Sequence, residues 1–333
     1  MEIKSDLLHH FKQLQESLTG VERATASVDV ATFIAEVRID ARVYKLYPMF
    51  LTTIEGRTTY AVQFSAAAWR FGGWRPYPGR VTPDVGRKLL FKKLLARHQL
   101  PTPEYSVDSR CALRDVLVKL DISSFGSDLR GPFKSARSIK LNVDKGEFVE
   151  QFISGEILKI WFYRVEPICM EIKPMPVVIG DGRSTIRDLA EKRRFRADNA
   201  AHWKCVEEVL AYFDRRLDER LPLGERQLID YRYTTAFVSP QETRDVHLAT
   251  DPTQRKDILF AVGDVIGRSL PDEWRGDALY SVDAIRDTRG KLWFLEANFN
   301  PFIHPFLYPT MIRGLGYFDP SDRIHCLAAN ASS

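Results

Sequence analysis

One stretch near the C-terminus constrains the fold most, because it reads as a β-hairpin that carries acidic side chains. Residues 278–298 (ALYSVDAIRDTRGKLWFLEAN) form two β-type runs around a turn at Arg289-Gly290. With this turn at the centre, Asp283 and Glu296 are equally far from the midpoint and are expected to lie opposite each other. Asn298 comes two residues after Glu296, so it projects from the same face of the strand.

Two carboxylates that face each other across a sheet repel unless a positive charge lies between them. A carboxamide oxygen beside them completes an all-oxygen set, which suits Mg²⁺ better than a soft metal. The alternative is a surface hairpin whose acids are solvated. The apolar neighbours favour the buried metal site: Val282, Ala284, Leu295 and Ala297.

Length and composition narrow the class of protein. The 333 residues carry a net charge of +4, which suits anionic small molecules and is too small to indicate nucleic acid. No apolar run reaches the roughly 18 residues of a membrane span, and the N-terminus does not resemble a signal peptide. We therefore expect a cytoplasmic protein without a membrane partner. The four cysteines form no CxxC pair, so no zinc site is expected.

The order of predicted elements favours an α+β fold built as successive lobes. A helix is expected at 4–18, β structure at 28–65 with a turn at Glu55-Gly56, and a linker or lid at 66–84. Trp69 and Trp74 of that linker either stack on a substrate or pack between subdomains. The remaining helices are expected at 84–98, 184–197, 200–218 and 253–269. The other strand-like runs are DVLVKL, ARSIKLNV, EFVEQFI, EILKIWFYRV, ICMEIKPMPVVI and RQLIDYRY.

The segment LEANFNP resembles the E-x-N-x-x-P motif of the ATP-grasp superfamily. The thirteen-residue step from Asp283 to Glu296 is also found in its D-alanine–D-alanine ligase branch. In that superfamily, these positions hold the Mg²⁺ ions that bridge the phosphates of ATP. The resemblance therefore implies that Asp283, Glu296 and Asn298 bind Mg²⁺, with Mn²⁺ as an alternative.

Two lysines match the phosphate-binding positions of the same superfamily. KLLFKKLLARHQLPTP places Lys88 at the first position, although Arg87 stands where an aspartate is usual. VLVKL places Lys119 at the second position, without the usual proline after it. Taken singly, each lysine is more often a solvated surface charge. Between them and the hinge, Gly126 and Gly131 are candidates for a loop that covers the phosphates.

EQFISGEILKI resembles the adenine hinge of the superfamily. The resemblance implies that Glu150 faces the adenine end, that Phe152 and Ile153 line the base pocket, and that Glu156 reaches the ribose hydroxyls. Backbone donors and acceptors beside apolar side chains are suited to a nucleobase. Taken without the resemblance, the segment is an ordinary amphipathic strand.

VVIGDGRSTIRDL resembles cyanophycin synthetase and the ATP-grasp half of bifunctional glutathione synthetase. Taken alone, Gly180-Asp181-Gly182 is a turn before a helix capped by Ser184. In this branch an arginine stands where this chain has Lys173, a candidate phosphate contact. LPLGERQLIDYRY resembles the next strand of the branch and makes Arg232 a candidate for steadying an acyl phosphate. The usual N-x-S-x-G-G is replaced by TTAFVSPQETRDV, which leaves the substrate open.

The resemblance implies an ATP-grasp fold and an ADP-forming carboxylate–amine ligase that uses ATP and Mg²⁺. We expect an N-terminal region at 1–83, a nucleotide-binding lobe at 84–175 and a metal- and substrate-binding lobe at 176–333. An amino acid or a peptide is the expected substrate, and a homo-oligomer is left open. His304 and the basic run 192–196 are further candidates for substrate contacts, against packing and a solvated helix face.

Three other functions fit the same scaffold. A graspetide-type macrocyclase would join side chains within a peptide. A small-molecule kinase would phosphorylate a hydroxyl group and release no free phosphate. A non-catalytic binding protein would be expected to have lost metal ligands, whereas all three are present here.

Overall fold

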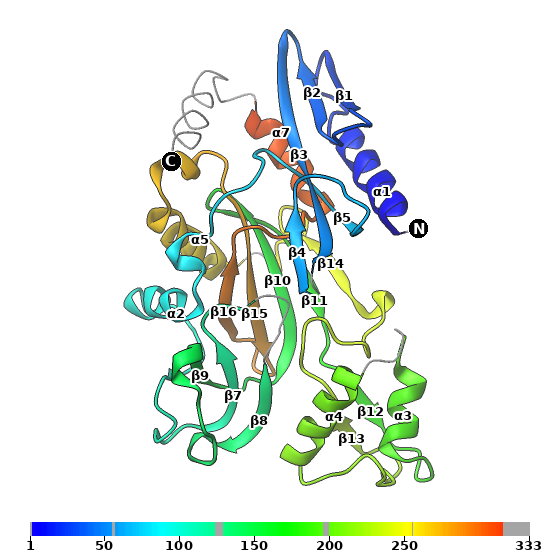
Figure 1. Ribbon diagram of the computed structural model, residues 1–333, viewed down its shortest axis with the longest axis vertical. Coiled ribbons are helices and arrows are strands. Elements are labelled where there is room, and N and C mark those ends of the chain that lie inside the picture. The colour runs from blue at the N-terminus through cyan, green and yellow to red at the C-terminus, as the bar shows by residue number, and fades with distance from the viewer. Residues whose placement is uncertain (1, 55–56, 124–128, 196–199, 255, 316–333) are drawn as a thin grey trace.

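The computed structural model describes residues 2–54, 57–123, 129–195, 200–254 and 256–315. It confirms the predicted α+β class, with helices packed on largely antiparallel sheets (Figure 1). Two predicted features lie outside the described residues: the turn at Glu55-Gly56 and the loop glycine Gly126. Among the helices that the structure describes, none combines the length and the apolar character needed to cross a bilayer.

The N-terminal region is a helix packed on a curled five-stranded sheet. The helix α1 (Glu2–Glu16) confirms the predicted one. The sheet contains β1 (Ala24–Val28), β2 (Ala35–Ile39), the long β3 (Arg42–Ile54), β4 (Arg57–Ala61) and β5 (Ala68–Arg75).

The expected linker at 66–84 is wrong for its first half, because β5 pairs with β3. Trp74 of β5 is fully buried and donates its indole N–H to the carbonyl of Phe33 at 2.8 Å, so it packs in the core. Trp69 is partly exposed. The glycines allow close approach, since a Cβ on Gly72 would lie 2.4 Å from the Phe302 ring.

The second unit places the start of a helix beside a four-stranded sheet. A turn at η1 (Asp84–Gly86) precedes α2 (Lys88–Arg97), near the predicted helix bounds. The sheet runs in the order β6-β9-β7-β8. Its strands are β6 (Tyr105–Ser106), β7 (Arg114–Leu120), β8 (Arg130–Ser135) and β9 (Glu147–Gln151).

The run ARSIKLNV is not a strand, contrary to the prediction. It contains the short turn η2 (Ala136–Ser138), and its last residue begins the short turn η3 (Val143–Lys145). The Ser135 hydroxyl accepts from the N–H of Arg137, and the Asn142 side chain accepts from the N–H of Lys145. Such local side-chain hydrogen bonds compete with strand pairing.

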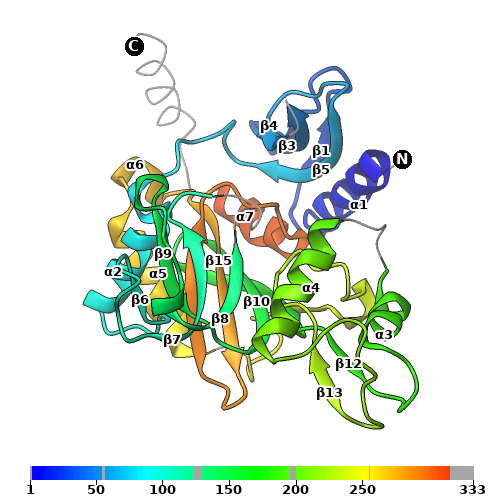
Figure 2. The ribbon, with the colours of Figure 1, turned by 60° about the horizontal axis from the view of Figure 1, so that its bottom comes forward.

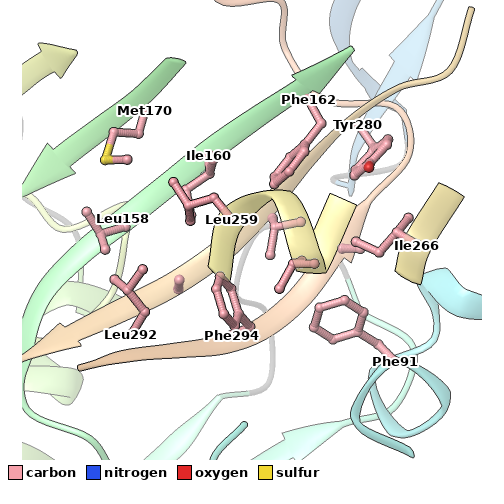
Figure 3. Close-up of a cluster of buried hydrophobic side chains, with 14 of the residues drawn as sticks. Phe91, Leu158, Ile160, Phe162, Met170, Leu259, Ile266, Tyr280, Leu292 and Phe294 are labelled. Carbon is pink, nitrogen blue, oxygen red and sulfur yellow. The ribbon is translucent and has the colours of Figure 1, made fainter. Parts of the chain in front are cut away.

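The central sheet has five strands in the order β14-β11-β10-β15-β16. They are β14 (Arg244–His247), β11 (Glu166–Lys173), β10 (Gly155–Tyr163), β15 (Leu279–Asp287) and β16 (Leu292–Asn298). One face packs on α5 (Asp257–Ser269), with Leu158, Ile160 and Phe162 of β10 directed toward Leu259 and Ile266 (Figure 3). The opposite face is free to carry the charged side chains described below.

A small α/β unit lies beside the central sheet (Figure 2). It comprises β12 (Val177–Ile179), β13 (Arg226–Leu228), α3 (Ile186–Arg193) and α4 (Ala200–Tyr212). The strand predicted over RQLIDYRY is limited to its first three residues. The cap of α3 is Thr185, in a capping box with Asp188, and not Ser184 as predicted. The remaining elements are η4 (Pro240–Glu242), α6 (Asp272–Arg275), η5 (Pro305–Leu307) and α7 (Tyr308–Leu315).

The central sheet takes strands from both sides of residue 175, where one lobe was expected to end. β10 and β11 precede that residue, whereas β14, β15 and β16 follow it. The division into 1–83, 84–175 and 176–333 stays a prediction.

A buried histidine joins the N-terminal region to the last helix. Nδ1 of His10 lies 3.0 Å from the Tyr308 hydroxyl, which also accepts the N–H of Trp74 at 3.1 Å. Burial, with nearby positive charge, lowers the pKa of His10 to about 3 from 6.5. The native state therefore disfavours the protonated ring, and it loses stability as the pH falls below 6.5.

We expect this loss to be measurable by urea unfolding at pH 7 and pH 4.5. At two pH units below the unfolded pKa, the free energy of unfolding should be lower by about 2–3 kcal/mol, because each unit contributes about 1.4 kcal/mol. His10→Gln removes the titrating ring and retains an acceptor for Tyr308. The wild type should therefore lose about 2–3 kcal/mol more than the variant between these pH values. Equal losses in the two proteins would contradict this role of His10.

Candidate active site

The predicted hairpin is present, and its register brings the two carboxylates together. β15 and β16 are antiparallel, and Asp283 pairs directly with Glu296. Nearer the turn, Ala284 pairs with Phe294, so a bulge shifts the register at this point. Without the bulge, Asp283 would face Leu295. Asp283 and Glu296 are therefore paired as predicted. The bulge brings this about, because it places Glu296 instead of Leu295 opposite Asp283.

The three predicted metal ligands lie together on the face of the central sheet opposite α5. The Asn298 amide donates to Oδ2 of Asp283 at 3.2 Å. Burial raises the pKa of Asp283, and Glu296 adds to this increase against the opposing charge of Lys159. Burial would also raise the pKa of Glu296, but Lys88, Lys119 and Lys159 together outweigh burial, so that pKa is lowered.

Two lysines neutralise this pair. Nζ of Lys88 lies 2.8 Å from Oε2 of Glu296, and Nζ of Lys159 lies 3.2 Å from Oδ1 of Asp283. Lys88 was predicted from the sequence and Lys159 was missed. Lys159 lies opposite Asp283 on β10, in a pairing between strands far apart in the chain. Only knowledge of that pairing could have identified it.

A carboxylate from another strand holds the start of α2. Asp121 follows β7 and accepts the backbone N–H of Leu89 at 2.8 Å. The same carboxylate pairs with Arg87 at 2.6 Å. An acid therefore lies at the N-terminus of α2, although Arg87 replaces the usual aspartate in the sequence. This contact fixes the helix end from which Lys88 reaches Glu296.

Glu150 is fully buried between two lysines. Nζ of Lys119 lies 2.5 Å from its Oε1, and Lys92 pairs with its other oxygen. Burial would raise the pKa of Glu150, but the two ammonium groups together lower it. Lys92 also donates to the Thr102 hydroxyl at 3.2 Å. The role of Glu150 at the adenine end stays a prediction.

We expect Lys92→Met to destabilise the protein, because it leaves the buried Glu150 with a single partner. Breaking a buried ion pair on one side costs about 3–5 kcal/mol, and Lys119 should keep the loss near the lower value. The double variant Lys92→Met/Glu150→Gln should recover part of it. Denaturant unfolding tests this, with the exposed neighbour Lys93→Met as a control that shifts stability by less than about 0.5 kcal/mol. Unchanged stability in Lys92→Met would refute the assignment.

An apolar cluster lies between the four-stranded sheet and the central sheet. Phe152 and Ile153, both predicted to line a base pocket, follow β9 and pack into this cluster. Gly155 begins β10, and a Cβ on it would lie 2.1 Å from the carbonyl oxygen of Arg286. A single oxygen of Glu156, Oε2, lies 2.7 Å from Nε and 2.6 Å from Nη2 of Arg286. The other members of the cluster are Leu117, Leu129, Ile157, Met175, Cys205, Val209, Leu228, Tyr231, Tyr233, Ile285 and Leu295.

The two predicted catalytic cations are each held by a neighbouring acid. Nζ of Lys173 lies 2.9 Å from Oε1 of Glu171. Arg232 contacts Asp230 through Nε at 3.1 Å and through Nη2 at 3.2 Å. Tyr233 follows Arg232, and its ring lies 3.9 Å from Nζ of Lys173 and 4.9 Å from Nζ of Lys159. Tyr233 thus brings the segment after β13 over the lysines.

The remaining candidates have structural surroundings. His304 is buried against Trp161, and its Nε2 lies 3.3 Å from Oδ1 of Asp245. These contacts favour a packing role for His304 over a substrate contact. In the turn 180–182, the Asp181 carboxylate accepts the backbone N–H groups of Arg183 and Ser184. Of the basic run 192–196, residues 192–195 are described, and Arg193 pairs with Glu242.

The donor set fits a hard cation. Two opposed carboxylates and a carboxamide offer only oxygen ligands, and two lysines already balance their charge. No group of three or more His, Cys, Asp or Glu residues forms a metal site in the part of the chain that the structure describes. These three residues alone would therefore leave Mg²⁺ short of ligands, and the rest must come from water or a bound anion.

Comparison with known proteins gives similarity to solved structures alone. No protein-family profile and no curated protein matches the chain. A bifunctional glutathione synthetase from Pasteurella multocida is similar at 14% identity, over 91% of this chain and 43% of that protein, with a TM-score of 0.42. A D-alanine–D-alanine ligase from Bacillus anthracis is similar at 11% identity, over 70% of this chain and 62% of the ligase, with a TM-score of 0.37.

The ATP-grasp ligase PsnB, in a complex with a minimal precursor, is similar at 12% identity. The match covers 69% of this chain and 60% of PsnB, with a TM-score of 0.35. This chain thus spans 43–62% of the length of the three proteins.

Proposed function

We propose that this protein is an ATP-grasp ligase that joins a carboxylate to an amine and converts ATP to ADP and phosphate. The observation that carries the proposal is the cluster of Asp283, Glu296 and Asn298 on the paired strands of one hairpin, with Lys88 2.8 Å from Glu296. Lys88 is about 200 positions before the hairpin in the chain, and each of the four residues stands at its place in the sequence motifs that resemble the superfamily.

In this proposal, Asp283, Glu296 and Asn298 hold Mg²⁺ together with the phosphates of ATP. The bound ion would supply charge neutralisation of the transferring phosphoryl group. Lys88 and Lys119 contact the same phosphates, and Phe152 and Ile153 cover the adenine. Positioning and charge stabilisation by these groups suffice for phosphoryl transfer, so no nucleophile from the protein is needed.

The substrate carboxylate attacks the γ-phosphoryl group and becomes an acyl phosphate. Lys173 and Arg232 are proposed to stabilise its negative charge, each held in place by a neighbouring acid. An amine then displaces the phosphate. We propose an amino acid or a peptide as the acid, on the strength of the sequence resemblance to peptide-forming ligases.

A phosphate-release screen with the proteinogenic amino acids and a set of dipeptides tests the function. We expect release of ADP and phosphate that depends on both an acid and an amine, with an amide product by mass spectrometry. A phosphorylated product without free phosphate would identify a kinase. AMP with pyrophosphate as products would overturn the acyl-phosphate chemistry.

A further inference from the structure

A row of charged side chains crosses all five strands of the central sheet. Directly paired residues place Asp245 of β14 beside Glu171 of β11, then Lys159 of β10, Asp283 of β15 and Glu296 of β16. Paired residues on antiparallel strands project from the same face of a sheet. The proposed function uses Asp283 and Glu296. It gives no role in the reaction to Glu171 and Asp245, which lie on the other side of Lys159.

Of Glu171 and Asp245, Glu171 is the one that lies beside Lys159, close to the proposed reaction site. The other four side chains of the row are 15–24% exposed, whereas Asp245 on the edge strand β14 is 50% exposed and contacts His304. Oε1 of Glu171 is buried and lies 2.9 Å from Nζ of Lys173. The Tyr233 hydroxyl is hydrogen-bonded to Glu171, and its ring lies over Lys159 and Lys173.

The order of charges along the row matches the order of the reactants. Neighbouring strands are about 4.8 Å apart, so each step along the row is about the length of one small chemical group. The acidic pair Asp283 and Glu296 would hold the metal and the phosphate. Lys159 comes next, where a substrate carboxylate needs a cation. Glu171 follows, where an incoming amine, a cation when protonated, needs an anion.

We propose that Glu171, oriented by Tyr233, binds the amine substrate and accepts its proton, which rests on the proposed ligase function. Glu171 takes one proton from the bound ammonium and passes it to solvent, which frees the nitrogen lone pair. This lone pair forms the C–N bond to the acyl carbon, the C–O bond to phosphate breaks, and phosphate leaves with that electron pair. The second proton of the nitrogen passes to the departing phosphate. Glu171 is thus a catalytic residue for the second half of the reaction.

Hydroxylamine separates this role from acyl-phosphate formation. It is a weak base that is unprotonated at neutral pH, so it traps an acyl phosphate as a hydroxamate without a protein base. The acids and amines are those of the phosphate-release screen, and Glu171→Gln, Tyr233→Phe and the edge control Asp245→Asn are compared with the wild type. Circular dichroism confirms that each variant is folded.

We expect Glu171→Gln to lower amide formation about a hundredfold, the usual range for a lost general base. The carboxamide of this variant retains an oxygen that accepts from Lys173, so hydroxamate formation should change less than about threefold. Amide formation by this variant should recover at a pH where the amine is free base in solution. Tyr233→Phe should show the same selective loss to a smaller extent, and Asp245→Asn should match the wild type.

Equal losses of amide and hydroxamate in Glu171→Gln would overturn the proposal, because Glu171 would then act on acyl-phosphate formation through Lys173. Unchanged amide formation would overturn it as well. If Glu171→Gln does not fold, the same comparison in Tyr233→Phe decides. A wild type that forms neither hydroxamate nor amide with any acid would instead overturn the ligase function itself.

Discussion

Replacing Glu296 by Gln is expected to lower turnover about a hundredfold or more, with the fold retained. Loss of one group that stabilises charge on a transferring phosphoryl group typically has an effect of this size. Asn298→Ala should have a similar effect, because it removes the amide that lies 3.2 Å from Asp283. The fold should survive Glu296→Gln, since the lost contact with Lys88 is offset by reduced repulsion against Asp283.

Steady-state phosphate release measures both variants, and thermal unfolding confirms that they are folded. The control is Asp264→Asn, a half-exposed carboxylate of α5 that pairs only with Arg268 one helical turn away among the contacts described. It should retain wild-type turnover. Near-wild-type activity in both Glu296→Gln and Asn298→Ala would show that the metal assignment is wrong.

Lys88→Met and Lys119→Met are each expected to weaken ATP binding by about tenfold to a hundredfold. A hydrogen bond to a charged group contributes about 1.5–3 kcal/mol, and 1.4 kcal/mol is a factor of ten in affinity. The two lysines come from a helix start and a strand end, so the local structure gives them no shared role. Under the proposed function, both converge on the phosphates.

Calorimetry of nucleotide binding across the variants provides this measurement, with circular dichroism as the folding check. Lys93→Met is the matched control, because Lys93 is exposed on the same helix as Lys88. Lys119→Met is compared with Lys119→Met/Glu150→Gln, which removes the carboxylate that Lys119 partly neutralises. Equal affinity in Lys88→Met, Lys119→Met and the wild type would show that these two lysines do not stand at the phosphate-binding positions.

Features that depend on local pattern could be predicted from the sequence. The hairpin around Gly290 follows from alternation and a turn residue, and its pairing put Asp283 opposite Glu296. The helices α1, α2 and α5 follow from their periodicity and their flanking residues. In each case, the decisive interactions are between residues close in the sequence.

Features set by contacts between distant segments could not be predicted. Lys159 meets Asp283 only because β10 pairs with β15, and Lys92 meets Glu150 only because α2 packs near β9. The strand β5 was read as a linker because of its glycines. The structure shows that Gly72 accommodates the Phe302 ring, and that its carbonyl accepts the N–H of Ile303 at 2.8 Å.

The most direct test of the central claim follows an oxygen atom. The acid found in the phosphate-release screen is labelled with oxygen-18 in its carboxylate and incubated with the enzyme, ATP, Mg²⁺ and the amine. An acyl-phosphate route transfers one labelled oxygen to inorganic phosphate, with ADP as the nucleotide product, and mass spectrometry should detect that phosphate. Label in AMP, with pyrophosphate released, would contradict the account. So would amide formation in which the released phosphate carries no label.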